Sequence, residues 1–190
     1  RRGFVLGINE SFDKLEAHLA PEMHKDIVSV PPGAEHFTID RVIGAPRALV
    51  WKCYTEPQHL ARFWGPRDTA CAATVDLRVG GVWRTRWTYD KGGEYGYASV
   101  YLEIVAPERL HYRDAPLDWP GGLDGLPPAQ LISTILLSDR PDGTNVHVHV
   151  RAASVALRDE TVARGFAAMV ATGNDRLEEY LASLREQGEA

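Results

Sequence analysis

Near its C-terminus the sequence reads DETVARGFAAMVATGNDRLEEYLASL (residues 159–184), and the choice among possible folds depends on this stretch. Its apolar side chains recur at spacings of three and four residues, which places them on one face of a long helix. The members of this face are Phe166, Met169, Val170, Leu177, Leu181 and Leu184. A helix with one apolar face must bury that face against another element.

The chain before this helix alternates in the manner of strands. After a first strand at 36–43, we expect strands near residues 69–78, 81–90, 94–105, 108–114, 129–139 and 144–153. Consecutive strands joined by short turns form an antiparallel sheet, and the connections are too short for the helices that parallel strands need. The sequence therefore predicts an α+β fold in which a curved antiparallel sheet wraps one long C-terminal helix.

Two short helices are expected after the first strand. Pro46 suits the first turn of one helix, and a second helix runs from Thr55 to Trp64, where Gly65-Pro66 ends it. A loop dense in proline and glycine at 115–128 is too long for a simple hairpin. Loops of this length serve as lids or binding loops, or are plain solvated excursions.

The N-terminal part of the sequence forms an extension. Residues 9–20 have helical spacing and are followed by proline, and the stretch 30–34 is rich in proline and glycine, which is typical of a linker. We therefore divide the chain into an extension with one extra helix at 1–34 and a main domain at 35–185.

Composition excludes several classes of function. The net charge is −5 and the pI is about 5.8, so nucleic-acid binding is not expected. No stretch approaches the length needed for membrane insertion, and two distant cysteines provide neither a disulfide framework nor a metal knuckle. We expect a cytoplasmic protein without a metal or a cofactor.

Five motifs resemble those of a known family. In order they are Ala45–Trp51, Thr55–Pro57, Phe63–Pro66, Asp76–Trp83 and Glu103–Leu110. Together they resemble the bacterial relatives of the activator of Hsp90 ATPase, in the START-like (SRPBCC) helix-grip superfamily, over roughly residues 36–184. This resemblance implies a helix-grip fold. It does not imply one reaction, because the superfamily includes carriers, receptors, cyclases and self-resistance proteins.

The sequence departs from that family in two places. Many relatives lack the N-terminal 34 residues, which could cover a sheet edge, close a pocket mouth or form a homodimer contact. Relatives also usually carry an aromatic residue near Met169-Val170 and an aliphatic one near position 174, where this chain has Asn174. A polar amide on the apolar stripe must find a partner, meet a ligand or reach water at the stripe's edge.

The strand at 81–90 points to a binding site. Period-two alternation puts Trp83, Thr85 and Trp87 on one face, opposite the expected helix. Which face of strand 94–105 joins them is left open, because its tyrosines compete with its aliphatic residues. The predicted ligand-binding residues are Phe63, Trp64, Trp83, Thr85, Trp87, Tyr101, Tyr112, Met169, Val170 and Asn174. The alternative is that these rings only fill the core.

The leading functional hypothesis is that an internal cavity binds a hydrophobic or aromatic small molecule, as in a carrier, sensor or sequestration protein. A second is an enzyme or self-resistance protein acting on an aromatic, polyketide-like natural product, with His59, Tyr101 or Asn174 moving protons. A third, from the family resemblance, is an Hsp90-type chaperone-interaction module. His147 and His149 share the outward face of their strand and lack a third ligand nearby, so they predict no metal site.

Overall fold

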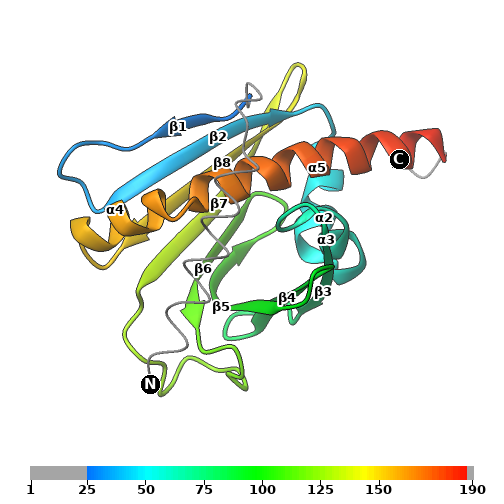
Figure 1. Cartoon of the computed structure of the whole chain (residues 1–190). Coiled ribbons are helices and arrows are strands. Elements are labelled where there is room, and N and C mark those ends of the chain that lie inside the picture. Colours follow the sequence, from blue (N-terminus) through cyan, green and yellow to red (C-terminus); the bar gives the residue numbers. More distant parts are fainter. Residues whose placement is uncertain (1–24, 188–190) are drawn as a thin grey trace.

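The computed structural model describes residues 25–187 and confirms the α+β helix-grip fold (Figure 1). Eight strands form one sheet in the order β1-β2-β8-β7-β6-β5-β4-β3, and every neighbouring pair is antiparallel. The elements are β1 (Ile27–Ser29), β2 (His36–Ile43), α2 (Arg47–Thr55), α3 (Pro57–Phe63), β3 (Thr69–Val75), β4 (Val82–Tyr89), β5 (Glu94–Val105), β6 (Arg109–Ala115), β7 (Leu131–Arg140), β8 (Gly143–Ala152), α4 (Val155–Ala163) and α5 (Phe166–Glu186).

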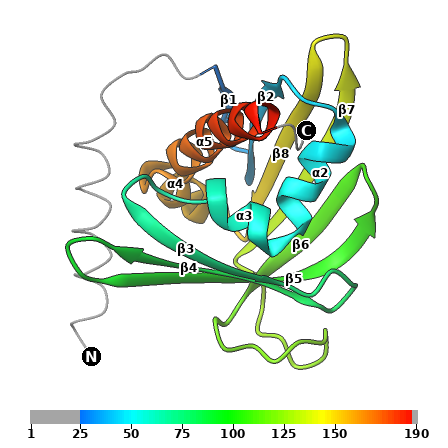
Figure 2. The ribbon, with the colours of Figure 1, turned by 90° about the vertical axis from the view of Figure 1, so that its right-hand side faces the viewer.

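The sheet curves around α2, α3 and α5, which occupy its concave side (Figure 2). The main core lies between these helices and the inward side chains of the strands. Along β2, for example, buried and half-buried residues alternate, with Phe37 and Ile39 fully buried. None of the helices within residues 25–187 combines the length and the apolar character needed to cross a membrane.

The prediction of a single helix over 159–184 is wrong, because this stretch belongs to two helices, α4 and α5. The helical conformation is interrupted at Gly165, whose φ of +82° lies in the left-handed region and ends the first helix. The apolar face is otherwise confirmed in α5, where Val170, Leu177 and Leu181 are buried. Phe166 and Met169 are half-buried.

A register shift resolves which face of β5 is inward. Tyr101 lies opposite Tyr112 of β6, but the pairing slips between Tyr101 and Glu103, so that Ile104 lies opposite Leu110. A bulge of this kind inserts one residue and reverses the alternation beyond it. Tyr101 and Ile104 therefore both pack on the concave side, and each competing pattern is correct for one part of the strand.

The loop between β6 and β7 is neither a lid nor a solvated excursion. It packs on the convex side of the sheet, where Leu117 and Trp119 contact a second, smaller core formed by Val82, Ala98 and Val100. Arg84 of β4 donates hydrogen bonds to the main-chain oxygens of Leu117 and Trp119, which fixes the loop to the strand. The loop shields apolar strand residues from water on the side of the sheet opposite α2, α3 and α5.

Part of the N-terminal extension belongs to the sheet. Residues 27–29 form β1 and pair with β2 at 38–40, so they cover one sheet edge. The helix expected at 9–20 lies outside the described residues, and the division of the chain at residue 34 stays a prediction.

Replacing Trp119 tests whether the convex-side loop stabilises the domain. We expect Trp119→Ala to lower the free energy of unfolding by about 1–3 kcal/mol, because the ring packs on the smaller core and is only partly exposed. Leu123→Ala is the matched control, since Leu123 lies in the same loop and is 45% exposed; it should change stability by less than about 0.5 kcal/mol. Urea unfolding measures both, and equal effects would contradict the assignment.

Candidate functional site

Most of the predicted ligand-binding residues lie together on the concave side, where their rings form what we call the aromatic wall. Eight of the ten predicted site residues lie in one buried cluster or directly on it; a ninth, Thr85, is buried beside them on β4. Those in the cluster are Phe63, Trp64, Trp83, Trp87, Tyr101, Tyr112 and Val170, and Asn174 contacts it through Tyr54. The tenth, Met169, is half-buried on α5 and does not share the full burial of Val170.

The rings of this cluster contact one another in a continuous series. Ring centroids are 6.1 Å apart for Tyr54 and Trp64, 5.3 Å for Trp64 and Trp83, and 5.2 Å for Trp83 and Tyr112. The planes are tilted or edge-on, which is the preferred arrangement for aromatic pairs. The series joins α2 to β6 across the concave side.

Several polar atoms in the same region are buried without a hydrogen-bond partner among the described residues. They are Trp64 Nε1, Trp83 Nε1, Thr85 Oγ1, Tyr101 Oη and Ser99 Oγ. Ser99 lies opposite Trp83 in the sheet. Its side chain lowers the pKa of the nearby Tyr97 hydroxyl, although the two groups do not meet the geometry of a hydrogen bond. Buried polar groups in proteins are nearly always paired, so a group of them on two adjacent strands requires a reason.

The tyrosines of this face are neutral. Burial raises the pKa of Tyr101 and of Tyr54 well above the usual value, and it raises the pKa of Tyr97 to about 12 despite the lowering effect of Ser99. The Tyr101 hydroxyl therefore keeps its proton near neutral pH and can donate a hydrogen bond.

Contacts from two sides hold the end of α3, which carries Trp64. The indole Nε1 of Trp87 donates to the Trp64 main-chain oxygen at 2.9 Å. From α5, Arg176 donates to the main-chain oxygens of Gly65 and Pro66, at 3.0 and 2.8 Å. The main chain at Trp64 is thus fixed, whereas the indole Nε1 of Trp64 has no partner in the described part of the chain.

Asn174 reaches neither water nor an empty space. It is 1% exposed, and its Nδ2 donates to Asp26 Oδ1 at 2.6 Å. Tyr54 donates to the Asn174 Oδ1 at 3.5 Å, which orients the amide. The interpretation of Asn174 as a residue at the water-facing edge of the stripe is therefore wrong.

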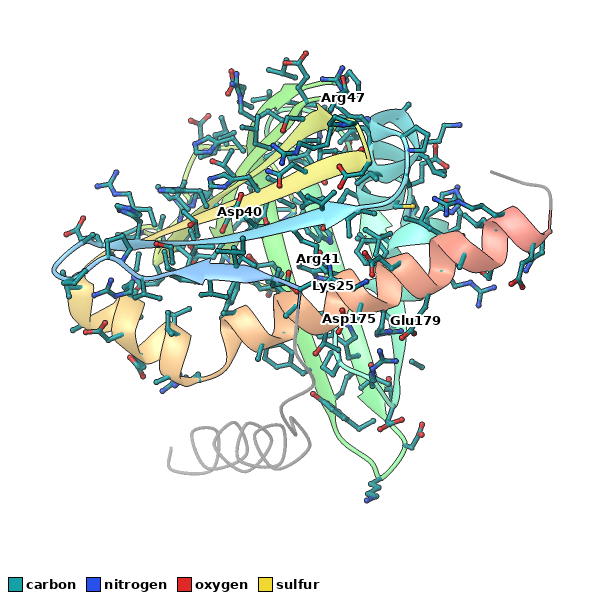
Figure 3. All side chains as sticks on the ribbon, turned by 90° about the horizontal axis from the view of Figure 1, so that it is seen from above. Lys25, Asp40, Arg41, Arg47, Asp175 and Glu179 are labelled. Carbon is teal, nitrogen blue, oxygen red and sulfur yellow. The ribbon has the colours of Figure 1, made fainter. Side chains whose placement is uncertain are left out.

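Sequence reasoning missed the ionic cluster around Arg41. The Arg41 side chain is 1% exposed and bonds to Asp26 at 2.7 Å, Asp175 at 2.8 Å and Glu178 at 2.9 Å. Arg41, Lys25 and Asp175 lie together between β2 and α5 (Figure 3). A signal was present, because Arg41 has the same alternation as the buried residues Phe37 and Ile39.

His59 lies near the surface, away from the aromatic wall, between the side chains of Glu56 and Tyr180. Its Nδ1 is 2.6 Å from the Tyr180 hydroxyl and its Nε2 is 3.4 Å from Glu56 Oε2. Tyr180 also lines a surface groove of about 520 Å³ between α3 and α5. The groove residues are Arg62, Arg176, Glu179, Tyr180, Ser183, Leu184 and Gln187.

The other histidines within residues 25–187 have partners on the convex side. His147 Nδ1 is 2.8 Å from Asp40 Oδ1, and His149 stacks on His36 with centroids 5.0 Å apart. Within residues 25–187, no three His, Cys, Asp or Glu side chains are grouped as metal ligands.

The fold and this site define a helix-grip protein with a closed, aromatic concave face. The chain belongs to the family described as activator of Hsp90 ATPase homolog 1-like proteins, whose model matches residues 44–182. Membership is compatible with ligand binding and with an Hsp90-activator role. The comparison with curated proteins finds no match.

Solved structures confirm the architecture. A Mycobacterium smegmatis protein is 18% identical with a TM-score of 0.71, over 83% of this chain and 97% of its own. A Nitrosomonas europaea protein is 24% identical with a TM-score of 0.69, over 80% and 96%. A protein from Aeromonas hydrophila described as AHSA1-like is 20% identical with a TM-score of 0.60, over 82% and 95%. At these identities the likeness shows the fold alone.

Gly65 tests how tightly the end of α3 is built. Its φ is +106°, and a Cβ there would lie 2.0 Å from Trp87 Nε1, so we expect Gly65→Ala to cost at least about 3 kcal/mol of stability. Gly92→Ala is the control, since Gly92 has a φ of +84° and no atom within 4 Å; it should cost about 1–2 kcal/mol. Urea unfolding compares them, and an equal loss would show that the contact with Trp87 carries no energy.

Proposed function

We propose that this protein binds an aromatic small molecule carrying hydrogen-bonding oxygen atoms, on the concave face between β4, β5 and the end of α3. The observation that carries the proposal is the set of unpartnered buried polar atoms on the aromatic wall, above all Trp83 Nε1, Thr85 Oγ1 and Tyr101 Oη. Leaving such a group unpaired costs about 1–3 kcal/mol. A ligand that pairs them recovers this energy.

The chemistry of these atoms restricts the ligand. An indole Nε1 can only donate, so Trp64 and Trp83 require acceptor atoms on the ligand. The Tyr101 and Thr85 hydroxyls can donate or accept. The surrounding rings favour a planar body, because apolar burial contributes about 25 cal/mol per Å² before ordering costs. A hydroxylated or carbonyl-bearing aromatic compound fits both demands.

Access to the wall requires a side chain to move, because Trp83 and Thr85 have no exposed surface. The Trp64 ring is the best placed to do so. Trp87 and Arg176 hold the main chain around Trp64. Its Nε1 makes no hydrogen bond to any described residue, so rotation of the ring breaks no hydrogen bond there. We propose that Trp64 is the gate of the site. A cytoplasmic location and assembly as a homodimer stay predictions.

Isothermal titration with 2-naphthol tests this proposal. We expect saturable binding at one site per chain, weakened about 5- to 10-fold by Thr85→Val and by Tyr101→Phe, because each loses one hydrogen bond to the probe. Neither change should lower the stability of the free protein, since each removes an unpaired buried hydroxyl.

Thr144→Val is the matched control. Thr144 is equally buried, but its hydroxyl donates to the Ala45 main-chain oxygen at 2.7 Å. This variant should lose about 1–2 kcal/mol of stability and keep its affinity for 2-naphthol. The proposal fails if 2-naphthol and a panel of hydroxylated aromatic compounds do not bind, or if binding ignores both hydroxyl deletions.

A second candidate function, catalysis in the surface groove, has one observation in its favour. Glu56 accepts only, so in neutral His59 the proton lies on Nε2 and Nδ1 accepts from the Tyr180 hydroxyl. A carboxylate, an imidazole and a hydroxyl in series match the arrangement of an activated nucleophile or general base. Tyr180 lines the groove, where a substrate could meet it.

Hydrolysis of p-nitrophenyl acetate separates this candidate from a purely structural contact. A catalytic role predicts a rate above that of buffer, reduced at least about 10-fold by His59→Gln and by Tyr180→Phe. His111→Gln is the control, since His111 bonds to Thr134 on the far side of the sheet. If the wild-type rate equals that of buffer, or the control loses as much, the groove is not a catalytic site for esters.

A further inference from the structure

The cluster around Arg41 contains two donors that converge on one carboxylate. Arg41 Nη1 donates to Asp26 Oδ2 at 2.7 Å, and Asn174 Nδ2 donates to Asp26 Oδ1 at 2.6 Å. Each oxygen of the carboxylate therefore has its own donor, from two different elements. Charged pairs of this geometry are the strongest hydrogen bonds that proteins use to recognise carboxylates.

The two donors are held rigidly. Arg41 lies on β2, which is paired on both sides, and its Nη2 is bonded to Asp175 and Glu178 of α5. Although burial opposes its charged form, the bonds to Glu178 and Asp175 raise the pKa of Arg41 above the usual value. Tyr54 orients the amide of Asn174 with its nitrogen toward Asp26.

The acceptor, in contrast, lies directly before β1, a short strand at the edge of the sheet. β1 has three residues, all of them exposed, and Ile27 is 71% exposed. The neighbouring ion pair between Lys25 and Glu178 has a lysine that is 72% exposed, and such surface pairs contribute little. Apart from the main-chain bonds of β1, the Asp26 carboxylate is thus the main attachment of this segment.

We propose that Arg41 and Asn174 form a carboxylate-binding site that Asp26 occupies in cis, and that a small carboxylate ligand takes its place when residues 25–29 detach. Without an occupant, Arg41 Nη1 and Asn174 Nδ2 would both lose their acceptor, beside an Arg41 Nε that has no partner within residues 25–187. Asp175 and Glu178 still balance the charge, but each donor left unpaired costs about 1–3 kcal/mol, so a replacement acceptor favours detachment.

The charges around the site favour a monoanion. Asp175 and Glu178 already lie against Arg41. Burial raises the pKa of Asp26 above its usual value, and the charge of Asp175 adds to this rise. A dianionic phosphate would meet more repulsion than a carboxylate in the same place. A planar carboxylate with a single charge also fits the geometry of the site, because each of its two oxygens can accept from one donor, Arg41 Nη1 or Asn174 Nδ2.

Thermal unfolding of full-length Asp26→Ala in sodium acetate tests the proposal. We expect acetate to raise the Tm of this variant saturably, by at least about 3 °C, because it binds the folded state alone. Sodium chloride at equal ionic strength and neutral acetamide should give no such rise. Wild type should respond much less at the same concentration, since its tethered Asp26 competes at a high effective concentration.

Two further variants identify the donors. Asp175→Ala removes another carboxylate from Arg41 but leaves Nη2 bonded to Glu178, so acetate should not stabilise it. Asp26→Ala combined with Asn174→Leu loses the second donor and should lose the acetate response. If Asp26→Ala does not fold in chloride, recovery of its circular dichroism in acetate is the readout.

Three results from the thermal unfolding of these variants would overturn the proposal. They are an Asp26→Ala variant that responds equally to chloride and acetate, one that is not rescued by acetate, and an acetate response that survives Asn174→Leu.

Amide hydrogen exchange on wild type tests whether acetate can displace Asp26 from the site. High acetate, but not chloride, should accelerate exchange of the amides at 27–29 severalfold; unchanged exchange would show that Asp26 cannot be displaced.

Discussion

The positive charge of Arg41, buried under α5, is the constraint around which the other parts of the domain are arranged. A guanidinium cannot leave water unless carboxylates replace its hydration, and breaking such a buried pair costs about 3–5 kcal/mol. Arg41 meets this demand by drawing Asp175 and Glu178 of α5 and Asp26 of the N-terminal segment to β2. The charge therefore fixes where the helix crosses the sheet and where the chain enters it.

The aromatic wall follows from that placement of α5. Arg176, one residue after Asp175, projects from α5 to the main-chain oxygens at the end of α3, so the position of Trp64 depends on the same helix. Trp64 in turn packs on Trp83, which packs on Tyr112. The ionic cluster and the wall are also linked directly, because Tyr54 contacts both Asn174 and Trp64.

The sequence was sufficient for the architecture and for most of the wall, because both depend on local periodicity. Alternation in β4 correctly grouped Trp83, Thr85 and Trp87, and the spacing in α5 identified its buried face. Features that depend on one residue's conformation were not predictable, such as the left-handed Gly165 and the bulge in β5. The partner of Asn174 was not predictable either, since Asp26 is 148 residues away and only the tertiary fold brings it near. The two places where the sequence was expected to depart from the family pattern, the N-terminal segment and position 174, thus meet in one hydrogen bond.

The sequence separation within the Arg41 cluster bears on the order of folding during synthesis. Asp175 and Glu178 follow Arg41 by 134 and 137 residues. While the strands emerge from the ribosome, Arg41 has only Asp26 as a nearby carboxylate in this cluster, and the concave side lacks its covering helix. Contacts of such long range are slow to form, and the exposed sheet would be open to misassociation in the meantime. The early pairing of Asp26 with Arg41 would give the nascent sheet an interim partner for its charge until α5 is made.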